Sequence, residues 1–209
     1  MATATTTARG AGRPAGSDRE RNLARIFDAA LICFSSKGYG GTHFADIAER
    51  VGFTRSALYQ YFPNKRALYH ALLDNIQAEH VGKVELVLAD AGDFRTRLRS
   101  IQAIFVADHE FDLHRSTFLA SVPLEMQRHP ELVLEERVSR SVPTRLLTFF
   151  QAAIDAGEIN PQFSAEDLLV ALLGGLLGMS LFQQSTGLGS VARANDAMMA
   201  MLDGQFLTS

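Results

Sequence analysis

Residues 42–62 read THFADIAERVGFTRSALYQYF, and their apolar spacing is typical of two short helices joined by a tight turn. Ala48 is small where the two helices would cross closely. Gly52 can adopt the left-handed backbone that a turn of about three to four residues needs. Thr42 is expected to cap the first helix and Thr54 the second. The spacing therefore predicts a helix-turn-helix.

The second helix of this pair is short, and Leu58 and Phe62 supply its inward face. A helix of this size can lie in the major groove of DNA. An arginine there can form a bidentate bond with guanine, and an alanine can touch the methyl group of thymine. The side chains predicted to point outward are Arg55, Ser56, Ala57, Tyr59 and Tyr61.

The stretch from Leu23 to Leu72 resembles the TetR family of bacterial regulators. The residues that carry the resemblance are Thr42, Ile47, Ala48, Val51, Gly52, residues 58–62, Asn64, Lys65, Ala67 and Leu68. Beyond Leu72 the likeness is only one of architecture. The resemblance implies a repressor that binds a palindromic operator as a homodimer and is released by a small-molecule effector bound in its helical body.

The resemblance also implies roles for single residues of the DNA-binding domain. By position, Thr42, Tyr59, Tyr61 and Lys65 would contact phosphates, and Arg55, Ser56 and Ala57 would face base edges. Two alternatives stay open. Tyr59 could serve only in packing, and Lys65 could be a solvated charge near the start of its helix.

The chain as a whole is predicted to be all-α, because helical periodicity recurs and no alternating strand pattern is present. Residues 1–16 are expected to form a disordered basic arm, residues 17–72 a three-helix DNA-binding domain, and residues 73–209 a larger helical domain for effector binding and dimerisation. Arg13 in the arm could enter a narrow minor groove, or the arm could be a tail with diffuse attraction for phosphates.

Helix boundaries follow from caps and stops. The first helix should begin at Ser17 and stop at Gly38, and the fourth should run from Asn64 to about His80. Later helices are predicted over residues 94–108, 113–127, 131–156, 165–186 and 191–206. Pro143 should kink or split the third of these later helices.

Charge and composition favour a cytoplasmic regulator. Residues 1–72 carry ten Lys and Arg against five Asp and Glu, whereas residues 81–209 carry ten against sixteen. A basic N-terminal part and an acidic body indicate that only the N-terminal part binds DNA.

Cys33 is the one cysteine, which fits a reducing compartment, and no apolar signal segment opens the chain. The apolar run 168–182 spans roughly 22 Å, too short for a membrane core of ~30 Å.

Two functions are assigned to the helical body. Small residues on the helix at 165–186 and methionines on the last helix predict a dimer interface, with packing inside one chain as the alternative: Ala171, Gly174, Gly175, Gly178, Met198, Met199 and Leu202. An aromatic-rich interior predicts a pocket for a hydrophobic or aromatic effector: Phe105, Phe111, Phe118, Met126, Phe149 and Phe150.

No pattern of residues predicts an enzyme, a cofactor or a metal site. His109, Glu110, Asp112 and His114 lie close together, but their spacing matches no established zinc pattern, and a charge cluster at a helix junction is expected. No nucleophile motif, phosphate loop or carboxylate pair stands out. Two other hypotheses remain open: a DNA-binding regulator without a small-molecule effector, controlled by a protein partner or acting as an activator, and a helical enzyme or lipid-interacting protein.

Overall fold

The computed structural model describes residues 15–133 and 142–203. Over these residues the chain is helical and holds no strand, so the all-α prediction is confirmed. The helices are α1 (Ala15–Gly41), α2 (Phe44–Val51), α3 (Arg55–Tyr59), α4 (Lys65–Leu88), α5 (Phe94–Phe111), α6 (Leu113–Arg128), α7 (Val142–Asp155), α8 (Ala165–Thr186) and α9 (Val191–Leu202), with a short 3-10 turn at Pro130–Leu132. Arg13 and the rest of the predicted arm up to residue 14 lie outside the described residues.

Side-chain caps begin several helices, and those at Thr54 and Asn64 agree with the sequence prediction. Thr54 accepts the amide of Ala57 at the start of α3, and Asn64 accepts the amide of Ala67 at the start of α4. Ser164 and Ser190 do the same for α8 and α9. These caps satisfy amides that have no partner inside the helix, and each typically stabilises a helix end by ~1 kcal/mol.

Several helix boundaries differ from the prediction, and α5, for example, ends at Phe111 and not at residue 108. Helix α1 continues past Gly38 to Gly41, with a break at Gly38, where φ is 69°. Helix α4 runs to Leu88 rather than to about His80, because Val84 gives its second half a buried face. The helix predicted over residues 131–156 is not one α-helix, because Pro130–Leu132 forms a 3-10 turn; the described part of α7, Val142–Asp155, contains Pro143.

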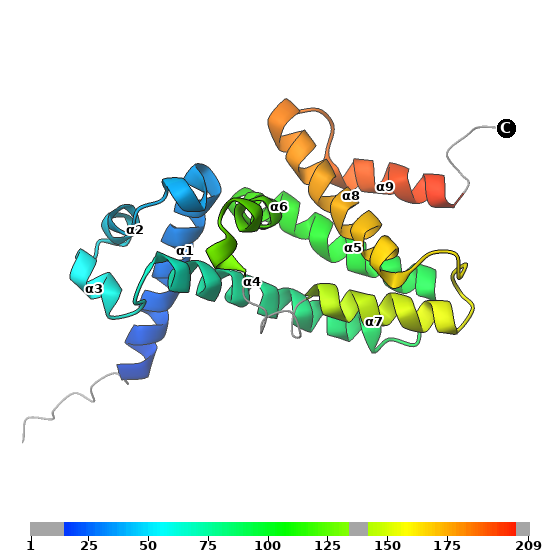
Figure 1. Cartoon of the computed structure of the whole chain (residues 1–209), viewed down its shortest axis with the longest axis horizontal. Coiled ribbons are helices and arrows are strands. Elements are labelled where there is room, and N and C mark those ends of the chain that lie inside the picture. The colour runs from blue at the N-terminus through cyan, green and yellow to red at the C-terminus, as the bar shows by residue number, and fades with distance from the viewer. Residues whose placement is uncertain (1–14, 134–141, 204–209) are drawn as a thin grey trace, which may run out of the picture.

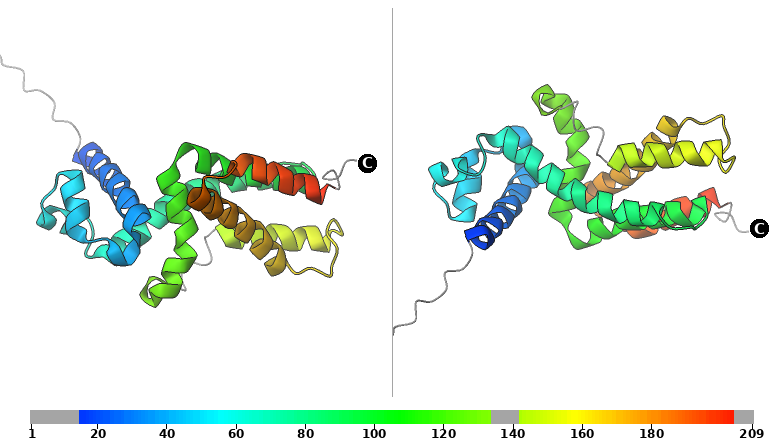
Figure 2. Two further views of the ribbon diagram at one scale, coloured as in Figure 1. Left: turned by 90° about the horizontal axis from the view of Figure 1, so that it is seen from above. Right: turned by 90° about the horizontal axis from the view of Figure 1, so that it is seen from below.

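The helices pack around two hydrophobic clusters. The head cluster joins α1 to α3 with the first half of α4, and it also contains Phe118 of α6 and Leu132. The body cluster gathers apolar side chains of α5, α7, α8 and α9 around Val84 of α4. Figure 1 shows α1, α2 and α3 at one end of an elongated molecule, with α4 running from that end into the body. The two turned views of Figure 2 agree with this arrangement.

Helix α8 carries the most exposed apolar surface of the body. Among the described helices it is the one long and apolar enough, by length and composition, to cross a membrane. Only 22% of its most apolar window is buried within this chain. Val170 and Phe182 are 71% and 62% exposed. A large apolar surface of this kind usually marks a contact with something outside the fold.

Candidate functional site

The turn between α2 and α3 has the geometry that the sequence predicts. Gly52 adopts φ 78° and ψ 30°, a left-handed conformation that costs glycine nothing. The amide of Phe53 donates to the carbonyl of Ala48 at 2.8 Å and closes the turn. Arg25 of α1 donates from Nη2 to the carbonyl of Val51 at 2.6 Å. The turn is therefore held from within and from α1, which keeps the orientation of α3 fixed.

The outer face of α3 presents unused polar groups. Arg55 and Ser56 are exposed, and Arg55 has no ion pair or hydrogen bond to any described residue. Ser56 Oγ lies 3.0 Å from the hydroxyl of Thr54. Ala57 is half-buried, and Tyr59 is 46% exposed with its ring packed on Phe44 at 4.9 Å between centroids. A free guanidinium beside a hydroxyl on a rigid helix can bind a phosphate or a base edge.

Tyr61 joins the end of this unit to α1. Its hydroxyl oxygen accepts a hydrogen bond from Asn22 Nδ2 at 3.0 Å, and its ring stacks on Phe53. The guanidinium of Arg19 lies 5.1 Å above the ring centroid. The hydroxyl hydrogen of Tyr61 is not used in these contacts, so it stays available to an oxygen acceptor such as a phosphate.

Thr42 is placed differently from the prediction. It is fully buried, and its hydroxyl donates to the carbonyls of Gly38, at 2.7 Å, and Cys33, at 3.1 Å. His43, not Thr42, stands immediately before α2, and its amide donates to the carboxylate of Asp46 at 3.3 Å. In this structure the Thr42 side chain therefore holds the end of α1 instead of facing a phosphate.

Lys65 is also tied to the protein itself. Its ammonium donates to the carbonyls of Tyr39, at 2.6 Å, and Thr42, at 2.9 Å, and lies 4.2 Å above the Tyr39 ring. Burial lowers the pKa of this ammonium. Lys65 thus connects α1, α2 and α4 at their junction. Its ammonium could contact DNA only while also donating to these two carbonyls, or by giving them up.

Sequence reasoning missed that Tyr39 connects the head to α6. The Tyr39 amide donates to the carboxylate of Glu125 at 3.1 Å, and the His129 ring packs edge-on against the Tyr39 ring at 5.0 Å. Glu125 is only 7% exposed. Because Tyr39 and Glu125 lie 86 residues apart, no local pattern could pair them. A buried carboxylate that meets the end of α1 gives α6 a direct contact with the helix that precedes the helix-turn-helix.

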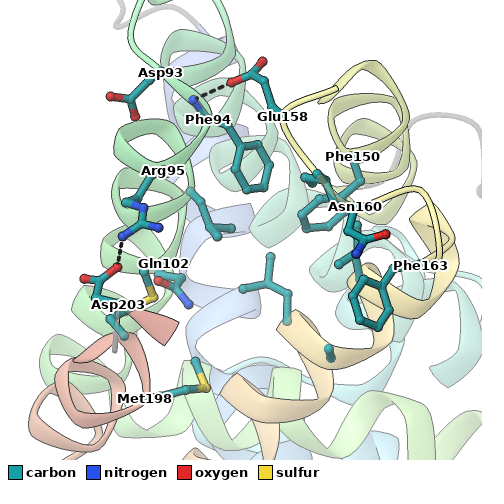
Figure 3. A pocket seen from close by; sticks show the side chains of 16 residues that line it. Asp93, Phe94, Arg95, Gln102, Phe150, Glu158, Asn160, Phe163, Met198 and Asp203 are labelled. Carbon is teal, nitrogen blue, oxygen red and sulfur yellow. Dashed lines mark hydrogen bonds and ion pairs between the residues drawn. The ribbon is translucent and has the colours of Figure 1, made fainter. Parts of the chain in front are cut away.

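The body contains a cavity of about 740 Å³, walled by α5, the end of α7, α8 and α9. Its apolar walls include Leu98, Phe150, Leu168 and Leu172, and polar groups lie at its edges (Figure 3). A space of this size lies within the range of small-molecule sites, about 300–1,000 Å³.

Of the six residues predicted to line an effector pocket, only Phe150 lines this cavity. Phe118 and Met126 pack in the head cluster instead. Phe105 stacks on His80, and Phe149 stacks on Phe94 inside the body cluster. Phe111 is 88% exposed. These five residues therefore do not line this cavity, because aromatic composition does not tell which side of a helix meets a cavity and which meets another core.

The glycines of α8 divide between two faces. A side chain at Gly174 or Gly178 would meet nothing within 4 Å, whereas one at Gly175 would lie 3.7 Å from Met198 of α9. Ala171, Met198 and Met199 line the body cavity. The Leu202 side chain lies outside the described residues. Of the residues predicted for a dimer interface, Gly174 and Gly178 therefore face outward, while Gly175 and Met199 pack within the chain.

The His and Asp residues at the α5–α6 junction have structural partners. His109 Nδ1 lies 2.9 Å from Ser180 Oγ, and His114 Nδ1 lies 2.9 Å from Ser35 Oγ. Asp112 caps α6 by accepting the amide of Arg115. No group of three or more possible metal ligands occurs in the described part of the chain.

Comparison with known proteins places the helix-turn-helix in a family. The description "Bacterial regulatory proteins, tetR family" matches residues 26–72. The chain is 33% identical over 119 residues to the transcriptional activator FasR of Mycolicibacterium smegmatis, covering 53% of this chain and 54% of that protein. It is 41% identical over 63 residues to the transcriptional regulator TtgR of Pseudomonas putida, covering 30% of each chain. These matches span about half or less of each relative.

Solved structures extend the likeness to the body, as a fold. The fatty acid degradation regulator FadR of Bacillus halodurans superimposes with a TM-score of 0.71 at 16% identity, over 87% of this chain and 94% of that one. FadR of Bacillus subtilis, solved with stearoyl-CoA, gives a TM-score of 0.65 at 19% identity, over 87% and 98% of the two chains. Residues 26–72 therefore match the TetR family of bacterial regulatory proteins, and the chain as a whole shares its fold with these solved structures.

Proposed function

We propose that this chain is a DNA-binding transcriptional regulator that acts in the cytoplasm. The observation that carries the proposal is the outer face of α3, where exposed and unpaired Arg55 stands on a helix fixed by Gly52 and Arg25. In this reading Arg55, Ser56 and Ala57 face base edges, and Tyr59 and Tyr61 contact the flanking phosphates. The matches to FasR and TtgR, both transcriptional regulators by name, support this.

The regulator acts as a homodimer through α8. Val170, Gly174, Gly178 and Phe182 follow one another at a spacing of four residues, so they share one face, and this face is exposed and uncharged. The two glycines would let the backbones of two α8 helices approach closely. A two-fold dimer would present two copies of α3 to a palindromic operator, with half-sites one helical turn of DNA apart, ~34–36 Å.

A small molecule in the body cavity controls DNA binding. Helix α8, which forms part of the cavity wall, contacts α6, and α6 contacts α1. Gln184 of α8 accepts a hydrogen bond from Thr117 of α6 at 2.6 Å, and Glu125, further along α6, accepts the amide of Tyr39 beside the helix-turn-helix. A ligand that displaces α8 would move α6 and thereby the end of α1. Binding should then be reciprocal, with DNA weakening the affinity for the ligand by the same factor.

The proposed response is repression relieved by the ligand. The 33% identity to FasR, an activator by name, favours activation as the second candidate. A reporter gene placed behind the regulator's binding site separates the two. Deletion of the regulator raises expression if it represses and lowers expression if it activates.

The DNA contact is tested with an Arg55→Ala variant on a site selected from random DNA by the full chain. The selected site should be palindromic. Arg55→Ala should relax the preference at one base position per half-site, at a cost of about 1–3 kcal/mol. The matched control is Arg128→Ala, at an exposed arginine at the end of α6. Unchanged base preference in Arg55→Ala, measured by fluorescence anisotropy, would contradict the assignment of α3.

A further inference from the structure

The polar side chains that line the body cavity differ in whether they already have partners. Asp93 accepts the amide of Thr96 at 2.7 Å and so caps α5. Glu158 accepts the amide of Phe94 at 3.2 Å and lies 4.0 Å from Arg97. These two carboxylates are therefore committed to the protein itself.

The remaining charges at the cavity are paired as well. The carboxylate of Asp203, 5% exposed, forms ion pairs with Arg95 and Arg99. Arg97 lies beside Glu158, and of these three arginines only Arg95 lines the cavity. Among the described lining residues the one guanidinium, that of Arg95, is already paired with Asp203, so an anion would find no free cation there. Burying an unmatched charge is far costlier than burying a neutral group.

Gln102 is the exception among the polar residues of this wall. It is 1% exposed, and its Oε1 is buried with no hydrogen-bond partner among the described residues. Leu98 and Gln102 follow Phe94 at intervals of four residues, so all three share the cavity face of α5. Figure 3 shows Gln102 beside Arg95 and Asp203, across the cavity from Asn160 and Phe163. A buried acceptor without a partner normally costs about 1–3 kcal/mol, so its retention beside a cavity indicates a partner that enters the cavity.

From this arrangement we infer that the effector is a neutral, largely apolar molecule with one hydrogen-bond donor, such as a hydroxyl, directed at Gln102. The inference rests on the proposed function, because it names the ligand class of the same cavity. The apolar part lies against Leu98, Phe150 and Leu172, and the donor reaches the Oε1 of Gln102. Gln102 thus selects a hydroxylated ligand over a hydrocarbon. The pairing of Arg95 with Asp203 disfavours an anionic ligand.

Three bicyclic probes test the inference on the full chain by calorimetry near neutral pH. They are naphthalene, 2-naphthol and 2-naphthoate, which share one apolar skeleton and differ in the polar group. The naphthol should bind about fivefold tighter than naphthalene, as expected for one neutral hydrogen bond. The naphthoate should bind at least about tenfold more weakly than the naphthol, because its carboxylate finds no free cation.

Substitution at Gln102 separates this residue from general apolar binding. Gln102→Leu should remove the preference for naphthol over naphthalene and leave the naphthalene affinity within about twofold. Gln127→Leu makes the same change at an exposed position of α6 and should alter nothing. The inference is overturned if naphthoate binds as tightly as naphthol, if the preference survives in Gln102→Leu, or if no probe binds.

DNA binding by the ligand-free chain is measured in parallel on the site selected above. It depends on α3 and not on the cavity. Loss of the probe pattern with intact DNA binding would overturn only the ligand class, whereas failure to bind any DNA would overturn the proposed function.

Discussion

In the head cluster, aromatic rings fill the space between helices, whereas the body cluster leaves a cavity of about 740 Å³ open between its helices. Phe34 lies 5.1 Å from the Tyr69 ring and 6.3 Å from the Phe118 ring, measured between centroids, and Tyr69 and Phe118 are themselves 5.1 Å apart. In the body, apolar side chains on facing helices are separated by the cavity. The Oε1 of Gln102, on the cavity wall, has no hydrogen-bond partner among the described residues.

This difference suits the two tasks that we propose. A DNA-reading helix must keep its orientation, and dense ring packing with direct ties such as Arg25 to the Val51 carbonyl fixes it. A ligand site needs space that the protein itself does not fill. The head also depends on α6, since Phe118 completes its core. The boundary expected after residue 72 is therefore crossed in space by a residue of the body sequence.

The largest effect is expected for Phe118→Ala. This side chain is fully buried among the rings of the head, so its removal should lower the free energy of unfolding by about 3–5 kcal/mol. Phe111→Ala is the matched control, because Phe111 is 88% exposed, and it should stay within about 0.5 kcal/mol of the parent. Urea unfolding measures both. Equal effects would mean that α6 does not complete the head core.

A smaller effect is expected on dimerisation from Gly178→Leu. A side chain there meets nothing within 4 Å in the single chain, so the fold should be unaffected, while two α8 helices should be forced apart. Overpacking of this kind typically costs about 1–3 kcal/mol. Gly82→Leu on α4 has equally open surroundings and serves as the control. Analytical ultracentrifugation gives the dissociation constants, and an undisturbed Gly178→Leu dimer would move the interface away from this face.

The smallest effect is expected for Lys65→Ala. The carbonyls of Tyr39 and Thr42 would lose their donor at a partly buried site, which should cost about 1 kcal/mol of stability. DNA affinity should fall on all sequences alike, since the junction below α3 loosens. Arg66→Ala, at the exposed neighbour, should leave stability unchanged. Lys65→Ala could instead reduce the slope of log K against log salt concentration by about one, with no loss of stability. In that case Lys65 contacts a phosphate and does not stabilise the junction through its hydrogen bonds.

Local rules made the helix-turn-helix predictable. Thr54 and Asn64 cap their helices, and Gly52 turns the chain through a left-handed conformation; each of these depends on residues within a few positions. The burial of Ile47, Ala48, Val51 and Leu58 also follows from helical spacing alone. The outward position of Arg55 follows as well, because the other side of this five-residue helix is buried in the core through Leu58.

The lining of the body cavity was not predictable in this way. Phe105, Phe118, Phe149 and Phe150 all sit on amphipathic helices, yet they occupy two different cores, and only Phe150 meets the cavity. Periodicity indicates that a side chain is inward, but it does not indicate which of two interiors the side chain enters. Likewise Thr42 and Lys65, read as phosphate contacts, have donors that the folded chain uses itself.

The sequence by itself determined most of the helices, the caps at Thr54 and Asn64, the turn at Gly52 and the outward face of α3, because these depend on neighbours along the chain. The tertiary structure alone decided that α6 supports the head through Phe118 and Glu125, and that Gln102 lacks a hydrogen-bond partner for its Oε1 among the described residues. Such contacts join residues far apart in the chain, Tyr39 and Glu125 being separated by 86 positions. The physical reason is that burial and hydrogen-bond satisfaction belong to packed helices, and the packing of one helix on another is not encoded within either helix alone.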